Sequence, residues 1–174
     1  MKKILGALSI VLVLASCQEQ KKMAFVNRSE VINEYQEKID VEAKFKEREE
    51  NFNKKSDSIG KDFQMAYQQF QMEASKMTEK QQQEQGQAFN QRGQMLQQQL
   101  QMEQQTLQQS FTTEMDSVMS HMKTFVQDYG KKNGYSFIFG TSDVTTTILY
   151  GEEVSDISDE VLKGLNDAYK KEEE

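Results

Sequence analysis

The feature that most constrains the fold is a long stretch without a strong helix breaker. The chain contains no proline, and between Val31 and Tyr129 it has only three glycines, at Gly60, Gly86 and Gly93. Proline ends a helix because it lacks the N–H donor, whereas an internal glycine costs only about 1 kcal/mol. This stretch can therefore form very long helices.

Apolar residues in this stretch recur every seven residues, or at alternating steps of three and four. This is the spacing of a coiled-coil seam. The members are Phe45, Phe52, Ile59, Phe63, Ala66, Phe70, Met77, Leu96, Leu100, Leu107, Met115, Val118, Met122, Phe125 and Tyr129. Because the remaining positions are mostly polar, the pattern predicts long, thin coils rather than a globule.

The apolar seam lapses near residue 80, in a polar run that extends to Gly86. Residues 30 and 130 lie equally far from residue 80. We therefore expect an antiparallel helical hairpin over residues 28–133, with its tip near 80–87 and arms of roughly 75 Å at 1.5 Å per residue. A single continuous rod of twice that length is the alternative.

The ends of the chain carry short apolar segments that are typical of strands. Strands are expected at residues 23–27, 135–139 and 145–150, with Asn27 or Ser29 capping the first helix. A final helix with an apolar face is expected to start near Asp156. The predicted fold class is therefore α+β, with the hairpin on a small body formed by residues 23–27 and 134–174.

One copy of this body offers little apolar area for a stable core, and its strand edges would need covering. The sequence therefore predicts an oligomer held by the strands. The apolar candidates for the contact are Phe25, Val26, Phe137, Ile138, Phe139, Ile148 and Leu149.

The N-terminus has the pattern of an export signal. Lys2 and Lys3 precede an apolar run from Ile4 to Leu14, which is shorter than the roughly 20 residues that span a membrane. The run ends in Leu-Ala-Ser-Cys, which resembles the lipobox of bacterial lipoproteins. That resemblance implies cleavage after residue 16, a lipid on Cys17 and a tether over residues 17–22. An ordinary signal peptide with an incidental cysteine is the alternative.

A lipobox and tether imply a protein anchored in the envelope of a Gram-negative bacterium and facing the periplasm. Residue 18 is Gln rather than the Asp associated with inner-membrane retention, which favours the outer membrane. Loss of residues 1–16 removes two lysines and changes the net charge from −7 to −9.

Composition excludes several function classes. One cysteine and one histidine cannot build a disulfide framework or a Cys/His zinc site, so no metal or cofactor is expected. A net charge of −7 argues against nucleic-acid binding. The acid pairs Glu49-Glu50 and Glu152-Glu153 fall on exposed coil or loop, which provides no pocket for acid–base catalysis. The chain is not expected to be an enzyme.

The order of these segments resembles the Skp (OmpH-like) periplasmic chaperones. The resemblance rests on MAFVNRSEVINEY at the front and on NGYSFIFG, TILYG and DISDEVLKGLN at the back, and it spans residues 23–169. It implies a homotrimer whose strands close a small β-body and whose three hairpins surround a cavity. Unfolded outer-membrane proteins would be held there without ATP.

Two departures from that family limit what carries over. The relatives are soluble and strongly basic, whereas this chain is acidic and has a lipobox. Binding of lipopolysaccharide or anionic lipid by basic arms therefore does not transfer, and membrane contact is expected only through the lipid. Residues 61–112 carry four Lys or Arg and five Asp or Glu, so the arm ends are almost neutral.

Client capture is therefore expected to depend on apolar contact. Met65, Met72, Met95 and Met102 fall on the flank of the seam, and Tyr67 lies beside the first of them. Flexible methionines suit a surface for many clients, although they also serve simply as helix-forming gap fillers. A tip near residue 84 would place Met65 level with Met102, and Met72 level with Met95. The alternative function is a coiled-coil spacer or scaffold tethered to the outer membrane.

Overall fold

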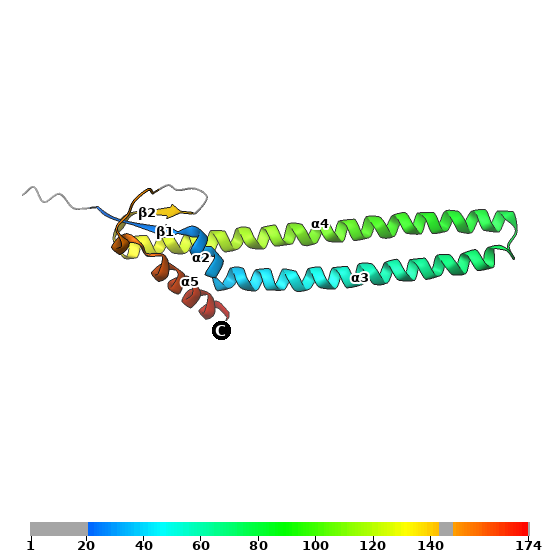
Figure 1. Cartoon of the computed structure of the whole chain (residues 1–174), viewed down its shortest axis with the longest axis horizontal. Helices are drawn as coiled ribbons and strands as arrows, with labels where there is room; N and C mark the ends of the chain where they lie inside the picture. Colours follow the sequence, from blue (N-terminus) through cyan, green and yellow to red (C-terminus); the bar gives the residue numbers. More distant parts are fainter. Residues whose placement is uncertain (1–20, 143–147, 174) are drawn as a thin grey trace, which may run out of the picture.

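The computed structural model describes residues 21–142 and 148–173. Two long helices run side by side away from a small body at one end of the molecule (Figure 1). This arrangement confirms the α+β class and excludes the continuous rod. The elements are β1 (Lys22–Asn27), α2 (Arg28–Glu34), α3 (Gln36–Ala74), α4 (Glu79–Lys132), β2 (Tyr135–Thr141), the 3₁₀ turn η1 (Glu153–Ser155) and α5 (Ser158–Glu173).

The two strands pair in parallel, with Met23 opposite Phe137 and Phe25 opposite Phe139. Parallel strands need a crossover connection, and here the entire helical hairpin supplies it. On the other edge of β1, the N–H of Ile157 donates to the carbonyl oxygen of Phe25 at 3.0 Å. The chain segment before α5 therefore covers that edge.

The first helix begins where one of the two expected caps lies. The Oδ1 atom of Asn27 accepts hydrogen bonds from the backbone N–H groups of Ser29 (3.2 Å) and Glu30 (3.3 Å). These N–H groups have no partner within the helix, so the side chain satisfies them. The cap turns the chain from β1 directly into α2.

The helix stops at Glu34 and restarts at Gln36, a break that the apolar spacing did not predict. The backbone of Tyr35 is extended there, and its buried ring packs edge-on against Tyr169 at 6.2 Å. The N–H of Gln36 donates to Oδ1 of Asn166 in α5 at 2.9 Å. Contacts with α5, rather than a local breaker, therefore set this bend.

The predicted tip at residues 80–87 is wrong, because these residues belong to α4. The turn lies between Ala74 and Glu79. Thr78 starts α4 with a capping box, in which its Oγ1 accepts from the N–H of Gln81 (3.3 Å) and its own N–H donates to Oε1 of Gln81 (3.0 Å). The polar run continues as helix because Gln and Glu are good helix formers.

The body is built around one apolar core to which β1, α2, α4 and α5 contribute. Its buried members are Ala24, Val26, Val31, Tyr35, Val118, Met122, Ile157, Val161 and Leu165. The last turns of α4 thus belong to the body as well as to the arm. The rest of α4 and nearly all of α3 project from it (Figure 1).

The structure does not contain the third strand expected at residues 145–150. Residues 143–147 lie outside the described part, and Ile148, Leu149 and Tyr150 have no regular secondary structure. Leu149 is 93% exposed and Tyr150 84% exposed. Their β-forming composition is not sufficient, because no neighbouring backbone pairs with them among the described residues.

Candidate functional site

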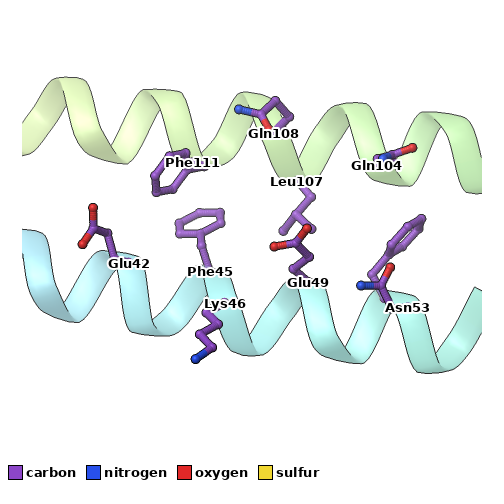
Figure 2. A pocket seen from close by; sticks show the side chains of 10 residues that line it. Glu42, Phe45, Lys46, Glu49, Asn53, Gln104, Leu107, Gln108 and Phe111 are labelled. Carbon is purple, nitrogen blue, oxygen red and sulfur yellow. The ribbon is translucent and has the colours of Figure 1, made fainter.

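A sparse row of apolar side chains holds α3 against α4. Figure 2 shows Phe45 and Phe111 pointing toward each other between the helices, and their ring centroids lie 5.3 Å apart. The ion pair between Lys44 and Glu114 spans the helices at 2.7 Å, and Lys55 forms a similar pair. Exposed ion pairs contribute only about 0–1 kcal/mol, so the apolar row supplies most of the cohesion.

One side of this hairpin is polar. A cavity of about 300 Å³ opens there between the two helices (Figure 2). Its polar lining residues are Glu42, Lys46, Glu49, Asn53, Gln104 and Gln108. We call this face of the arm the glutamine side.

The opposite side carries the methionines. A groove of about 590 Å³ lies there, lined in part by Arg48, Asn51, Lys55, Gln99, Met102 and Thr106. Met65 and Met72 follow Asn51 by two and three heptads, and Met95 precedes Met102 by one. Residues separated by whole heptads keep the same position around a coiled coil. All four methionines therefore lie on this face, which we call the methionine side.

These methionines are not used to hold the hairpin together. The side chains of Met65, Met72, Met95 and Met102 are 60%, 70%, 65% and 61% exposed. They form a row of accessible apolar groups along an arm whose other exposed positions are mostly polar. Packing of α3 against α4 does not require apolar side chains at these four positions.

The pairing expected from a tip near residue 84 is wrong. Lys55 forms its 2.7 Å ion pair with the residue that follows Met102, which places Met102 beside Lys55. Met65 lies ten residues further along α3, about 15 Å away at 1.5 Å per residue. The same register separates Met72 from Met95, so the methionines are spread along the arm.

An aromatic cluster lies near the tip and includes a residue that the sequence analysis missed. The ring of Phe89 lies 5.7 Å from Phe63, 5.9 Å from Tyr67 and 5.2 Å from Phe70. Phe89 was overlooked because polar residues surround it, although its seven-residue spacing to Leu96 was an available signal. Tyr67, a predicted client-binding residue, is 45% exposed at the margin of this cluster.

A second exposed apolar surface lies on the body. Met23 and Phe137 are cross-strand neighbours that are 54% and 52% exposed. Phe139 is 40% exposed, and its ring stacks on that of Phe137 at 6.0 Å. Leu149 is almost fully exposed. Gly151 packs on the ring of Phe25, the β1 neighbour of Phe139, whereas Met23 and Phe137 remain exposed among the described residues.

The remaining oligomer candidates are placed differently. Val26 is buried in the core, and Ile138 packs against it, so both serve the single protomer. Phe25 is half-buried, with its ring so close to Gly151 that a Cβ atom there would lie 2.5 Å from it. Ile148 is half-buried as well.

The described residues include no group of three or more His, Cys, Asp or Glu side chains able to hold a metal ion. The single histidine instead joins the two helices, with Nδ1 of His121 lying 2.9 Å from Oε1 of Glu37. The hydroxyl of Tyr35 donates to the other oxygen of that carboxylate at 2.6 Å. These groups therefore have structural partners at the root of the arm.

Cys17 lies outside the described residues. The first element, β1, begins five residues after it, at Lys22. Within the described part of the chain, no helix is both long and apolar enough to cross a membrane.

Comparisons with known proteins fit this geometry. Residues 22–165 match the family model of OmpH-like outer membrane proteins, and residues 1–18 match the prokaryotic membrane lipoprotein lipid attachment site. A crystal structure of an OmpH-like protein from Caulobacter crescentus CB15, proposed to be an outer membrane chaperone, aligns with a TM-score of 0.73. The alignment covers 86% of each chain at 11% identity, so it shows a shared fold. No curated protein matches. The chain belongs to the OmpH-like outer membrane protein family, and it is a periplasmic, membrane-anchored lipoprotein.

Proposed function

We propose that this lipoprotein is an ATP-independent holdase, which binds unfolded outer-membrane or exported proteins in a cavity between three arms. The observation that supports this function is the methionine side of the arm. Its four methionines are each at least 60% exposed. Exposed apolar groups in a row indicate a surface that meets another molecule.

Methionine suits unfolded clients for a physical reason. Its unbranched side chain has three rotatable bonds and a polarisable sulfur, so it adapts to apolar groups of different shapes. A surface that must accept many sequences benefits from this adaptability. The wide spacing of the four residues along the arm matches a client that is extended rather than compact.

The tethered spacer is the weaker of the two candidate functions. The apolar seam does not lapse near the tip, because Phe89 and Gly93 are half-buried against α3. A continuous seam is compatible with a spacer. A spacer, however, gains nothing from exposed methionines on one face, so this face favours binding.

Exposed apolar groups on the body support the proposed trimer. The apolar side chains of Met23, Phe137 and Phe139 are exposed, and the outer edge of β2 pairs with no strand of the described chain. Open edges and apolar faces are unfavourable in water. Three copies related by a three-fold axis would bury both, and would direct their arms to the same side.

The lipid anchor is proposed to lie in the outer membrane, because Gln18 lacks the retention signal considered above. From there, the anchored chaperone would receive clients close to their destination.

A direct test is an aggregation assay with an unfolded porin. The mature chain without its lipid should suppress aggregation at a stoichiometric ratio of trimer to porin, in the absence of ATP. Native mass spectrometry on the same sample would report the oligomer. A well-folded trimer that leaves aggregation unchanged would support the spacer instead.

A further inference from the structure

The lipid anchor joins the protein at a defined end of the body. Five peptide units separate Cys17 from Lys22, and a fully extended chain spans at most about 3.6 Å per residue. The start of β1 is therefore held within roughly 18 Å of the lipidated cysteine. The membrane surface and this end of the body must be close neighbours.

This end of the body lies opposite the arms. β1 starts at Lys22 and runs toward α2, after which α3 continues away from the body (Figure 1). α4 returns along α3 and ends at Lys132, beside the start of β1. The side chain of Lys22 confirms the proximity, because its Nζ donates to the carbonyl oxygen of Asn133 at 3.2 Å.

Four lysines gather at this end of an acidic protein. Lys21 precedes β1, Lys22 is its first residue, and Lys131 and Lys132 lie in the last turn of α4. All four are exposed. We call these four residues the lysine end. Cations at a helix C-terminus stabilise the helix dipole, which accounts for the last two lysines. The helix dipole does not account for Lys21 and Lys22, which lie before and at the start of β1.

Acidic groups also lie near the lysine end. Asp128 forms an exposed ion pair with Lys131 at 3.1 Å. Glu152 and Glu153 lie before and within η1, on the opposite edge of β1 from β2. α5 starts beside the last turns of α4 with Asp159 and Glu160, since its Gly164 packs on Phe125, and it then runs toward the side of the arms (Figure 1). The four lysines nevertheless remain exposed at the end where the tether emerges.

We propose that the lysine end is a membrane-contacting surface that binds anionic phospholipid headgroups beside the lipid anchor. The contact extends beyond the lipid, and it directs the arms away from the membrane. Each lysine near an anionic surface strengthens binding by roughly fivefold, and this attraction is lost beyond a Debye length. The short tether keeps the lysines within that range.

The proposal is testable on the mature chain carrying Cys17→Ser, so that no lipid masks the weaker contact. The probe is sedimentation with vesicles of phosphatidylethanolamine and phosphatidylglycerol, compared with vesicles of phosphatidylethanolamine and phosphatidylcholine. Binding should require the anionic lipid and weaken with salt. Replacing the four lysines with glutamine (K21Q, K22Q, K131Q and K132Q) should reduce binding by tenfold or more.

The matched control removes four lysines from the arm (K46Q, K54Q, K61Q and K76Q), for the same change in net charge. It should bind the anionic vesicles as the parent does. Equal binding by the lysine-end variant, or an equal loss in the arm variant, would overturn the proposal. So would binding to both kinds of vesicle alike. Circular dichroism would confirm that both variants keep the parental helix content.

Orientation is a second measurement, made on the lipidated protein in anionic vesicles. Because the only natural cysteine carries the lipid, Glu79→Cys provides one label site at the arm tip. α3 has 39 residues and is about 58 Å long at 1.5 Å per residue. Energy transfer from that label to a membrane dye should therefore be weak. Strong transfer would show arms lying on the membrane and would contradict the proposed orientation.

Discussion

Gly164 of α5 lies directly against the ring of Phe125 of α4, and a Cβ atom at this position would overlap the ring. The contact is where the C-terminal helix crosses the root of the arm. Replacing Gly164 with alanine should force the two helices apart. We expect the free energy of unfolding to fall by about 1–2 kcal/mol, after allowing for the higher helix propensity of alanine.

Gly60→Ala is the matched control for that substitution. Gly60 also lies within a helix, but no atom lies within 4 Å of the position its Cβ would take. This variant should gain about 0.5–1 kcal/mol from helix propensity alone. Urea unfolding of both variants would separate the two effects, and a stabilised Gly164→Ala variant would show that the packing against α5 is loose.

The capping box at the tip gives a second prediction. Thr78→Ala removes the acceptor for the N–H of Gln81 and should destabilise the start of α4 by about 1 kcal/mol. Hydrogen exchange at residues 79–82 should speed up about fivefold while the body is unaffected. Thr106→Ala, whose hydroxyl only bonds Met102 within the same helix, should leave the tip unchanged.

The sequence predicted the arms well because their periodicity is local and repeated. A helical seam depends on residues three and four apart. Phe45, Phe52 and Leu107 therefore identify the seam even when the facing helix is not known. The location of the turn was harder to predict, because the polar run after Lys80 can form a helix as readily as a loop. The capping box of Thr78 was the stronger signal.

The body was harder to predict because its contacts join distant residues. The break at Tyr35 depends on Asn166 and Tyr169, more than 130 residues later. The composition of Ile148 and Leu149 is strand-like, yet no strand forms there, because pairing depends on an available neighbour. Apolar content indicated which residues belong to the body, but not which face of the sheet they occupy.

The exposed face of the sheet gives a third prediction. Phe137→Asp would bury an unpaired charge if three copies pack there, at a cost of several kcal/mol. Sedimentation should then show monomers, whereas Phe137→Leu should retain the trimer. A monomeric parent protein with full helix content would contradict the trimer.

The methionine side gives the fourth prediction. Replacing Met65, Met72, Met95 and Met102 together with glutamine nearly preserves helix propensity and removes apolar surface that contributes about 1–2 kcal/mol per residue against a client. Affinity for an unfolded porin should fall at least tenfold, with helix content and oligomer mass unchanged. Added salt should have little effect on the parent, because screening acts on charges.

The control for that variant changes the glutamine side instead. Alanine at Gln94, Gln101, Gln104 and Gln108 alters four exposed positions of α4 without removing a methionine. It should bind porin as the parent does. A methionine variant that binds normally, or parental binding that collapses with salt, would rule out apolar capture by this face.

The parallel pairing of β1 with β2 has a consequence for how the protein is made. Lys22 emerges first from the export machinery, and its partner Tyr135 follows only after both arms have passed. The body therefore cannot close during translocation, and its assembly is governed by non-local contacts, which slow folding. Once α3 and α4 have formed and paired, the start of α3 and the end of α4 lie close together. The loop that must be closed to pair β1 with β2 is then effectively short. Equal insertions in α3 and α4 that keep the seam in register would lengthen the arms. They would not change the distance over which β1 and β2 must come together to pair.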